Sequence, residues 1–447
     1  MEPKVITDVP GPRSREIWER EKQHITSGLD GCTLLAPIVF ERGEGSIVWD
    51  VDGNSYIDCA AGVLTNSTGH CHPRVVQALQ EQAGKLWHVH NFPTPQKHEL
   101  CELLAEKFPP GIDTFAFYSG GTETVEAGLR AAISYTKRYE FVSFHHAYHG
   151  RSLGSRGLAL WWGKAFGPVS SNFIRSPFAY CYRCPFGLSY PACDLRCAEY
   201  LQETIQFNSW GSLAGIVFEP ILGAGGVVIP PDGFLQRVVE IARRHGALVL
   251  ADEILTGIGR TGRFLAVEHW GIEPDLVFAG KGLGSGFPVM VLGGRREIMN
   301  QAPFGSPGGA STSFGGNPLA VAAALATLQV IYEEDLLGHT QAMGQMLRER
   351  FAALKDKHPL IGDVRGLGLL WGVELVRDRK TKEPAEEEGR QLYLECLRRG
   401  LKTITPGHLT RFSPPLNIPR DLLEMAVDIY DDALSAVEKQ FGYAKTR

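Results

Sequence analysis

Short apolar runs rich in β-branched and aromatic residues alternate with stretches of helical period along the middle of this chain. The runs cover residues 115–118, 141–144, 215–218, 247–250 and 276–278. A helical stretch at 235–245 lies between two of them. This alternation is typical of parallel strands joined by crossover helices. We therefore expect an α/β fold with a mostly parallel central sheet that is covered by helices.

The chain has 447 residues, which at roughly 100–200 residues per domain suggests two or three structural units. An Asp52-Gly53 pair between apolar runs predicts a β-hairpin near the start. After about residue 330 the pattern changes to amphipathic helices around IGDVRGLGLLWGVELV and TRFSPPL. We expect residues 1–70 to form an N-terminal arm and part of a small domain, and 71–330 to form the large domain. Residues 331–447 then complete a small α+β domain built from both termini.

Composition excludes several classes of protein. Hydrophobic residues make up 44% and charged residues 21%, and the formal net charge is −5, so nothing calls for a nucleic-acid or membrane partner. No apolar run approaches the roughly 18 residues needed to span a bilayer. The N-terminal residues lack the apolar segment of a secretory signal. The nine cysteines are an odd number spread over a long chain, as in reducing compartments. We expect a cytoplasmic protein.

Two predicted strand ends carry the residue types of a Schiff-base site. Asp252 ends the run ALVLAD, and Lys281 follows LVFAG among glycines. Ligands of open α/β sheets bind at the carboxyl ends of strands. A lysine held at such a point can act as a nucleophile toward a carbonyl carbon. In isolation, a salt bridge would explain Asp252 and solvation would explain Lys281.

Further segments supply the rest of a ligand site. The small-residue turn before Gly121 and Thr122 opens a helix and suits an anion. Tyr148 follows a strand and can stack on a flat ring. Ser313 lies in a hydroxyl-rich turn, and Arg411 can bind a carboxylate through two parallel hydrogen bonds. Each residue alone has a purely structural explanation. Together they suit one ligand that carries a phosphate, a flat ring and a carbonyl carbon, and pyridoxal 5′-phosphate has all three.

The stretch from LVLADEILTGIGRTGRF to PDLVFAGKGLGSGFP resembles the class III (ornithine/4-aminobutyrate-type) pyridoxal-phosphate aminotransferases of fold type I. Supporting segments are NSTGHCHP, YHG, EPILGAGG, SFGGNPLA and IGDVRGLGLLWGVEL. The resemblance implies an enzyme that moves an amino group between an amine or amino-acid donor and a keto acid or other carbonyl acceptor, with ping-pong kinetics. It also implies a homodimer with shared active sites.

The resemblance implies catalytic roles for two residues. Lys281 forms the Schiff base with the cofactor and later shuttles a proton. Asp252 pairs with the pyridinium nitrogen and so favours its protonated form.

Five other residues are implied to bind the cofactor. Gly121 and Thr122 hold the phosphate, and Tyr148 stacks on the ring. Glu219 lies near the cofactor. Ser313 stands where the family has a phosphate-binding threonine that belongs to the neighbouring subunit.

Substrate recognition is implied for Arg411, which matches the family's arginine for the α-carboxylate, and for Val63. Leu255 replaces a glutamine that usually contacts the phenolic oxygen of the cofactor. Ala224 replaces an acid that often pairs with the arginine in members acting on ω-amines. Val63 stands where a decarboxylating relative has its key glutamine, so decarboxylation is disfavoured.

Racemases or epimerases and amino-sugar aminotransferases share the scaffold and remain alternative functions. A binding protein that has lost catalysis is a further alternative. Further candidates for the pocket wall are Leu64, Trp87, His88, His90 and Trp161.

Four cysteines have the spacing C-x2-C-x8-C-x3-C, at Cys181, Cys184, Cys193 and Cys197. This spacing is compatible with zinc or an iron–sulfur cluster, and prolines and glycines interleave as in a metal-held loop. The family does not generally require a metal here. Packed thiols in a surface insertion are therefore the favoured interpretation, and no metal is assigned from the sequence.

Overall fold

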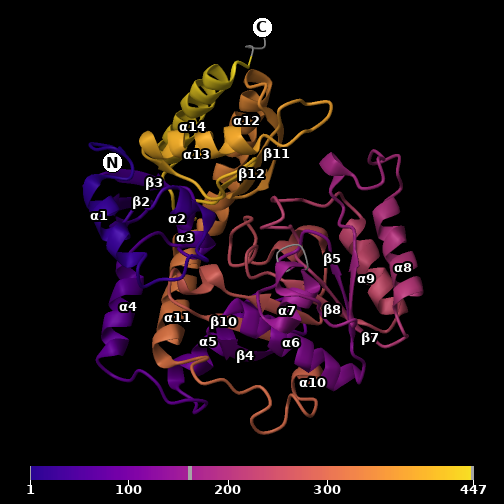
Figure 1. Ribbon diagram of the computed structural model, residues 1–447. Helices are drawn as coiled ribbons and strands as arrows, with labels where there is room; N and C mark the ends of the chain where they lie inside the picture. Colours follow the sequence, from indigo (N-terminus) through magenta and orange to yellow (C-terminus); the bar gives the residue numbers. More distant parts are fainter. Residues whose placement is uncertain (1, 160–163, 444–447) are drawn as a thin grey trace. The chain divides into compact units, whose positions relative to one another are not determined.

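The computed structural model describes residues 2–159 and 164–443 (Figure 1). The chain divides into two units. We call Arg74–Glu333 the central unit, and we call Met1–Pro73 together with Glu334–Arg447 the terminal unit.

The central unit carries the long sheet. Its helices are α4 (Pro73–Ala83, which begins at the boundary), α5 (Pro95–Lys107), α6 (Gly121–Thr136), α7 (Leu153–Leu158), α8 (Arg196–Asn208), α9 (Phe234–Arg244), α10 (Arg296–Met299) and α11 (Pro318–Glu333). Its strands are β4 (Thr114–Tyr118), β5 (Glu140–Phe144), β6 (Phe173–Ser176), β7 (Leu213–Phe218), β8 (Leu248–Asp252), β9 (Leu276–Ala279) and β10 (Met290–Gly294).

These strands form a seven-stranded sheet in the order β4-β10-β9-β8-β7-β5-β6. Strand β10 is antiparallel to both of its neighbours, and the other pairings are parallel. The predicted mostly parallel sheet is therefore confirmed, and the five predicted runs correspond to β4, β5, β7, β8 and β9. Strands β6 and β10 were not predicted. Gly293 and Gly294 weaken the strand signal of β10, and its pairing with two neighbours supplies what its propensity lacks.

Every residue of β5, β7, β8 and β9 is buried. Full burial on alternate sides of a strand requires cover on both faces of the sheet, as parallel sheets generally have. Helix α6 packs with α7 and α10, and α8 packs with α9, as Figure 1 shows. The carboxyl ends of the parallel strands are thus left at one edge of an otherwise enclosed sheet.

Helix α6 approaches the sheet closely because its inner face is made of small residues. Ala127, Ala131 and Ala132 are completely buried in the core cluster that includes Phe278 of β9. A Cβ added at Gly128 would lie 2.2 Å from Cε1 of Phe278, so only glycine fits there. This contact sets the distance between α6 and the strand that precedes Lys281.

The terminal unit combines both ends of the chain. Its helices are α1 (Pro12–Glu21), α2 (Gly31–Leu35), α3 (Ala61–Leu64), α12 (Leu336–Lys357), α13 (Glu386–Arg398) and α14 (Arg420–Phe441). Its strands are β1 (Phe40–Glu44), β2 (Ile47–Asp50), β3 (Ser55–Asp58), β11 (Ile361–Leu367), β12 (Leu370–Leu375), β13 (Leu401–Lys402) and β14 (Leu409–Phe412).

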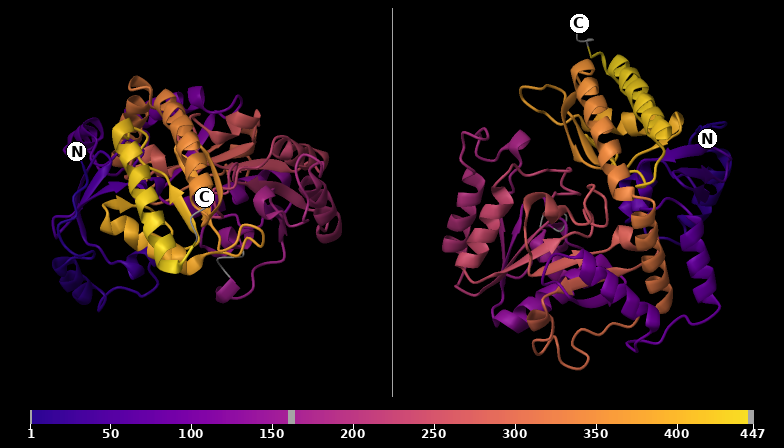
Figure 2. Two further views of the ribbon diagram at one scale, coloured as in Figure 1. Left: turned by 90° about the horizontal axis from the view of Figure 1, so that it is seen from above. Right: turned by 180° about the vertical axis from the view of Figure 1, so that it is seen from behind.

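The hairpin predicted at Asp52-Gly53 is confirmed, since β2 and β3 are antiparallel and Trp49 pairs with Ser55. Strand β13 adds to β3 in parallel, with Leu401 opposite Ile57, so residues from both termini share one sheet. A second sheet has the order β11-β12-β14. Helices α12 and α14 lie side by side, as the orange and yellow helices of Figure 2 show.

None of the helices in the described part of the chain combines the length and the apolar character that crossing a bilayer would require.

The close packing of α6 on β9 predicts that Gly128→Ala destabilises the protein. The added Cβ meets a ring that is enclosed by the core, and overpacking of this kind typically costs about 1–3 kcal/mol. Gly84→Ala is the matched control, because the nearest atom to a Cβ at Gly84 is 3.7 Å away. Urea unfolding of both variants measures the difference, and equal stabilities would contradict the packing argument.

Candidate active site

Six sequence-predicted residues lie at or just after the carboxyl ends of strands in the central unit. Gly121 and Thr122 begin α6 just after β4, and Tyr148 follows β5. Glu219 follows β7, Asp252 ends β8, and Lys281 comes two residues after β9. Since these strands are parallel, their carboxyl ends lie at the same edge of the sheet. The structure therefore places these residues at one edge of the sheet.

Asp252 is held by hydrogen bonds at both carboxylate oxygens. The side chain is buried, with 3% exposure. Nδ1 of His149 lies 2.7 Å from Oδ2, and the N–H of Ile254 donates to Oδ1 at 3.1 Å. Nε2 of the same histidine lies 3.2 Å from the hydroxyl oxygen of Ser143. Because a carboxylate only accepts, Nδ1–H is the donor to Asp252.

His149 is a residue that the sequence analysis missed. It stands in the segment FHHAYHG, from which only Tyr148 was selected. Its partner Asp252 lies 103 residues further along the chain, so no local spacing shows the contact. The available signal was a histidine in the loop that follows a strand, next to a residue already selected.

Glu219 is a buried acid that organises the backbone around it. The N–H of Tyr148 donates to Oε1 at 2.8 Å, and the N–H of Gly223 donates to Oε2 at 2.9 Å. Burial raises the pKa of Glu219 to about 7, and the charge of Asp252 adds to this effect. His149 and the two N–H groups act in the opposite direction. Glu219 therefore fixes the position of the Tyr148 backbone and titrates near neutral pH.

The start of α6 has the features of an anion site. The first N–H groups of a helix have no intrahelical acceptor, and this end carries the positive end of the helix dipole. The hydroxyl of Thr122 accepts the N–H of Arg151 at 3.2 Å. A Cβ at Gly121 would lie 3.3 Å from Cδ1 of Ile254, which places the helix start against the loop that follows Asp252.

Ser313 is exposed on the segment that precedes α11. Its neighbour Thr312 donates its hydroxyl to Glu123, in the first turn of α6, at 2.5 Å. The segment is thereby attached to α6 while Ser313 and Phe314 remain exposed at the surface.

Lys281 begins a short 3-10 helix, Lys281–Gly284, with a φ of +42°. Left-handed backbone is costly for a residue other than glycine, and such strain is concentrated at functional sites. The preceding Gly280 lies against Met290, since a Cβ there would be 1.8 Å from the sulfur. Packing of the 3-10 helix against α11 holds the turn in place.

The two predicted substrate-binding residues lie in the terminal unit. Arg411 is on β14, opposite Gly372 of β12, and is 5% exposed. Val63 is in α3 and is 45% exposed. The N–H of Ser413 donates to the carbonyl of Cys59, which joins the end of β14 to the segment before α3.

The other predicted pocket-wall residues differ in their surroundings. Leu64 is buried and Trp87 is exposed, whereas His88 contacts the ring of Phe314. His90 lies 3.3 Å from the hydroxyl of Ser311. Trp161 lies outside the described residues.

Leu255, which stands where the family usually has glutamine, packs over Gly223. A Cβ at Gly223 would lie 2.3 Å from Cδ1 of Leu255. This side chain therefore takes up the space beside the turn that binds Glu219, and it offers no hydrogen bond there.

The described residues of the central unit fit pyridoxal 5′-phosphate. The carboxylate of Asp252 is buried and already oriented at the sheet edge. A helix start suited to a phosphate lies against the same loop. The amine of Lys281 follows the strand that pairs directly with that of Asp252. These three groups match the ring nitrogen, the phosphate and the aldehyde of that cofactor.

Comparison with known proteins adds independent information. A family model described as Aminotransferase class-III matches residues 33–434. Leucine/methionine racemase from Thermococcus litoralis is 36% identical, over 96% of this chain and 97% of that protein. The 4-aminobutyrate aminotransferase of Mycobacterium leprae is 35% identical, over 95% and 96%. A thermostable (S)-enantioselective omega-transaminase from Thermomicrobium roseum has a similar structure, with a TM-score of 0.88, 32% identity, and coverage of 97% of this chain and 100% of that one.

The contact between His149 and Asp252 predicts an energetic coupling between these two residues. His149→Leu removes the donor to a buried carboxylate, which should destabilise the protein by about 1–3 kcal/mol. Ser143→Ala, which removes only the outer contact, should cost less. In a double-mutant cycle with Asp252→Asn, measured by urea unfolding, the two effects should not add. Additive effects would show that the two side chains do not interact.

Proposed function

The chain belongs to the class-III aminotransferase family and is an enzyme of that type with pyridoxal 5′-phosphate as its cofactor; we propose that its chemistry depends on Lys281. The reaction moves an amino group from an amine or amino-acid donor to a keto acid or other carbonyl acceptor in two half-reactions. The observation that carries the proposal is the placement of Lys281 and Asp252 after two adjacent parallel strands.

Lys281 acts twice in this proposal. Its amine would hold the bound cofactor at the aldehyde carbon, with release of water, and would give way to the amine of the substrate. The amine set free in this way would serve as the base that moves a proton from the substrate carbon. The strained turn at Lys281 supports the role, because left-handed backbone at a residue other than glycine is concentrated at functional sites.

Asp252 would hold a negative charge beside the ring nitrogen of the bound cofactor and so would favour the protonated form of that nitrogen. When bound, the cofactor supplies a ring that delocalises the electron pair left behind as the substrate carbon loses its proton. His149 orients the carboxylate through its contact with Oδ2. The hydrogen bonds at both oxygens of Asp252 support this role, because they leave the carboxylate little freedom to rotate.

The remaining cofactor contacts follow from the family pattern. We assign the phosphate to Gly121 and Thr122, with Ser313 contributed by a partner subunit. Tyr148 stacks on the ring, and Glu219 positions it through the backbone contact. The 2.8 Å hydrogen bond from the N–H of Tyr148 to Glu219 supports this pairing of roles.

Arg411 is assigned to the carboxylate of the substrate, and Val63 to the wall of the substrate pocket. The position of Arg411 on β14, paired with β12, supports its assignment, because a guanidinium held on a strand can bind a carboxylate through two parallel hydrogen bonds.

A homodimer is supported by apolar side chains that are exposed in the central unit. Trp87, Phe92 and Phe314 are 66%, 73% and 63% exposed. Large exposed apolar side chains that gather on one surface mark interaction sites, and the contact of His88 with Phe314 brings the first and last of these segments together. A second copy of the chain is the occupant we propose, because Ser313 lies on the same exposed segment.

The nine free thiols support a cytoplasmic location.

Racemisation is the second candidate, because a racemase is among the relatives with 36% identity. Incubation of the holoenzyme with a single amino acid in deuterated water separates the two reactions. A racemase exchanges the α-hydrogen and inverts the centre without an acceptor. An aminotransferase needs a carbonyl acceptor for turnover, and an amine-donor screen with such an acceptor should yield the aminated product. Inversion without transfer would overturn our proposal.

Replacement of the proposed nucleophile predicts loss of turnover without loss of the fold. Lys281→Ala should lower the rate of amino-group transfer by at least about 10³-fold, since both covalent binding and proton transfer are removed. Hydride reduction followed by peptide mass analysis should find the cofactor on Lys281 of the wild type. An adduct on another lysine would contradict the assignment.

The assignment of Arg411 predicts a selective effect on substrates that carry a carboxylate. Arg411→Leu should lower kcat/KM for amino acids by about 10²-fold or more and should change the value for uncharged amines far less, because only the former lose a charge-assisted pair. The control is Arg42→Leu, which changes an arginine whose guanidinium lies over the ring of Trp49. Equal losses for both substrate classes would remove Arg411 from substrate binding.

A further inference from the structure

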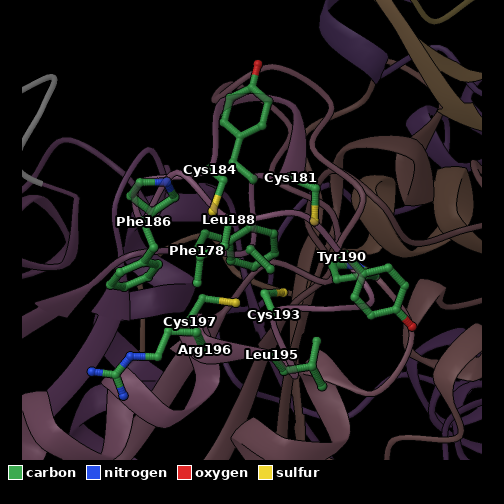
Figure 3. A pocket seen from close by; sticks show the side chains of 14 residues that line it. Phe178, Cys181, Cys184, Phe186, Leu188, Tyr190, Cys193, Leu195, Arg196 and Cys197 are labelled. Carbon is green, nitrogen blue, oxygen red and sulfur yellow. The ribbon is translucent and has the colours of Figure 1, made fainter.

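The four cysteines with the C-x2-C-x8-C-x3-C spacing surround one small cavity in the segment between β6 and α8. Figure 3 shows their side chains around this space, which has a volume of about 20 Å³. The rest of the lining is largely apolar and includes Phe178, Phe186 and Leu195. Among the described residues, no three His, Cys, Asp or Glu side chains are placed to hold a metal ion. The thiols thus face an apolar space, and no ligand is assigned to them.

A buried carboxylate in the terminal unit holds the turn that carries Val63. Asp58 ends β3 and has 0% exposure. The N–H of Ala60 donates to its Oδ1 at 3.0 Å, and the N–H of Gly62 donates to its Oδ2 at 3.2 Å. Both oxygens of one side chain are therefore used to bind the backbone just after it.

Two side chains from other segments allow this carboxylate to be buried. Lys402 lies opposite Asp58 in the pairing of β13 with β3, and its Nζ donates to Oδ1 at 2.9 Å. Nε2 of His70 donates to Oδ2 at 2.8 Å, since a carboxylate only accepts. Burial acts to raise the pKa of Asp58, but the charge of Lys402 and the hydrogen bond from His70 outweigh it and hold that pKa well below its usual range. Asp58 thus stays ionised and keeps its contacts with the turn.

The turn itself has a strained backbone. Ala61 has a φ of +45° and Leu64 a φ of +63°, and Gly62 between them has a φ of +68°. Left-handed backbone is costly at residues other than glycine, and it persists only where the surroundings hold it in place. The two N–H groups that Asp58 binds lie on either side of Ala61. The carboxylate is therefore placed to keep this conformation.

The conformation of the turn determines which side chain is presented. Ala61 is 0% and Leu64 is 2% exposed, whereas Val63 is 45% exposed. The carbonyl of Cys59, directly after Asp58, accepts the N–H of Ser413 at 2.8 Å. This bond attaches the same segment to the end of β14, the strand of Arg411. A change in the backbone of the turn would therefore move the Val63 side chain relative to its surroundings in the terminal unit.

We propose that Asp58 is a positioning residue for the substrate pocket, because its carboxylate fixes the backbone of residues 60–64 and with it the place of the Val63 side chain. This role rests on the proposed function, which assigns Val63 to the pocket wall. A wall held in one place excludes donors whose side chains need the same space. In a hydrophobic pocket, one methylene changes kcat/KM by about 10- to 200-fold. Asp58 thus selects donors by side-chain length without touching them.

The test compares Asp58→Asn with the wild type, both as holoenzymes. Asparagine keeps the shape of the side chain and one acceptor oxygen but loses the charge and the acceptor for the N–H of Gly62. Donors are an unbranched series of the class that the wild type accepts, such as alanine to norleucine. We expect the ratio of kcat/KM to shift by about 10-fold or more toward the longer donors. The kcat for the shortest donor should change little, because the reacting groups are untouched.

Asp50→Asn is the matched control for a general loss of stability. Asp50 lies on β2 of the same sheet and is 1% exposed. It accepts the N–H of Asn54 and the hydroxyl of Tyr56, both at 2.8 Å, and so organises the hairpin between β2 and β3. This variant should lower the Tm as Asp58→Asn does, but it should leave the donor ratio unchanged.

Hydrogen exchange of the purified protein provides a readout that needs no turnover. Peptides covering residues 59–66 should exchange about 10-fold faster or more in Asp58→Asn, because the turn opens more often. They should not do so in Asp50→Asn. Equal exchange in the two variants, or faster exchange in Asp58→Asn with an unchanged donor ratio, would overturn the proposal.

Val63→Phe separates this inference from the proposed function on which it rests. A bulkier wall should shift the donor ratio toward the shorter donors. An unchanged ratio in Val63→Phe would overturn the assignment of the wall and the role of Asp58 with it. A changed ratio in Val63→Phe but not in Asp58→Asn would overturn the role of Asp58 alone.

Discussion

The parallel pairing of β8 with β9 is the constraint on which the site depends. Asp252 lies opposite Phe278 in this ladder, and Lys281 follows three residues later. Because the two strands run in the same direction, the carboxylate and the amine leave the sheet at the same edge. An antiparallel pairing would put them at opposite edges.

Hydrogen bonds between distant segments orient the side chains that the pairing of β8 with β9 places at the sheet edge. Asp252 is oriented by His149, which follows a strand that is two positions away in the sheet. Glu219, from the strand in between, binds the backbone at Tyr148. Two buried acids therefore have different tasks: Asp252 faces a histidine, whereas the pKa of Glu219 is raised to about 7 by burial and by the neighbouring carboxylate.

Local pattern was enough to predict the mostly parallel sheet and the hairpin at Asp52-Gly53, because each is encoded within a few neighbouring positions. It also marked Asp252 and Lys281 as candidates at two strand ends. Strand β10 escaped detection because its glycines are poor strand formers that two neighbours hold in place. His149 escaped because its partner is 103 residues away. By itself the sequence determined which residue types stand at the strand ends. Only the tertiary structure decided which of those side chains meet, because strand order and burial arise from contacts between distant segments.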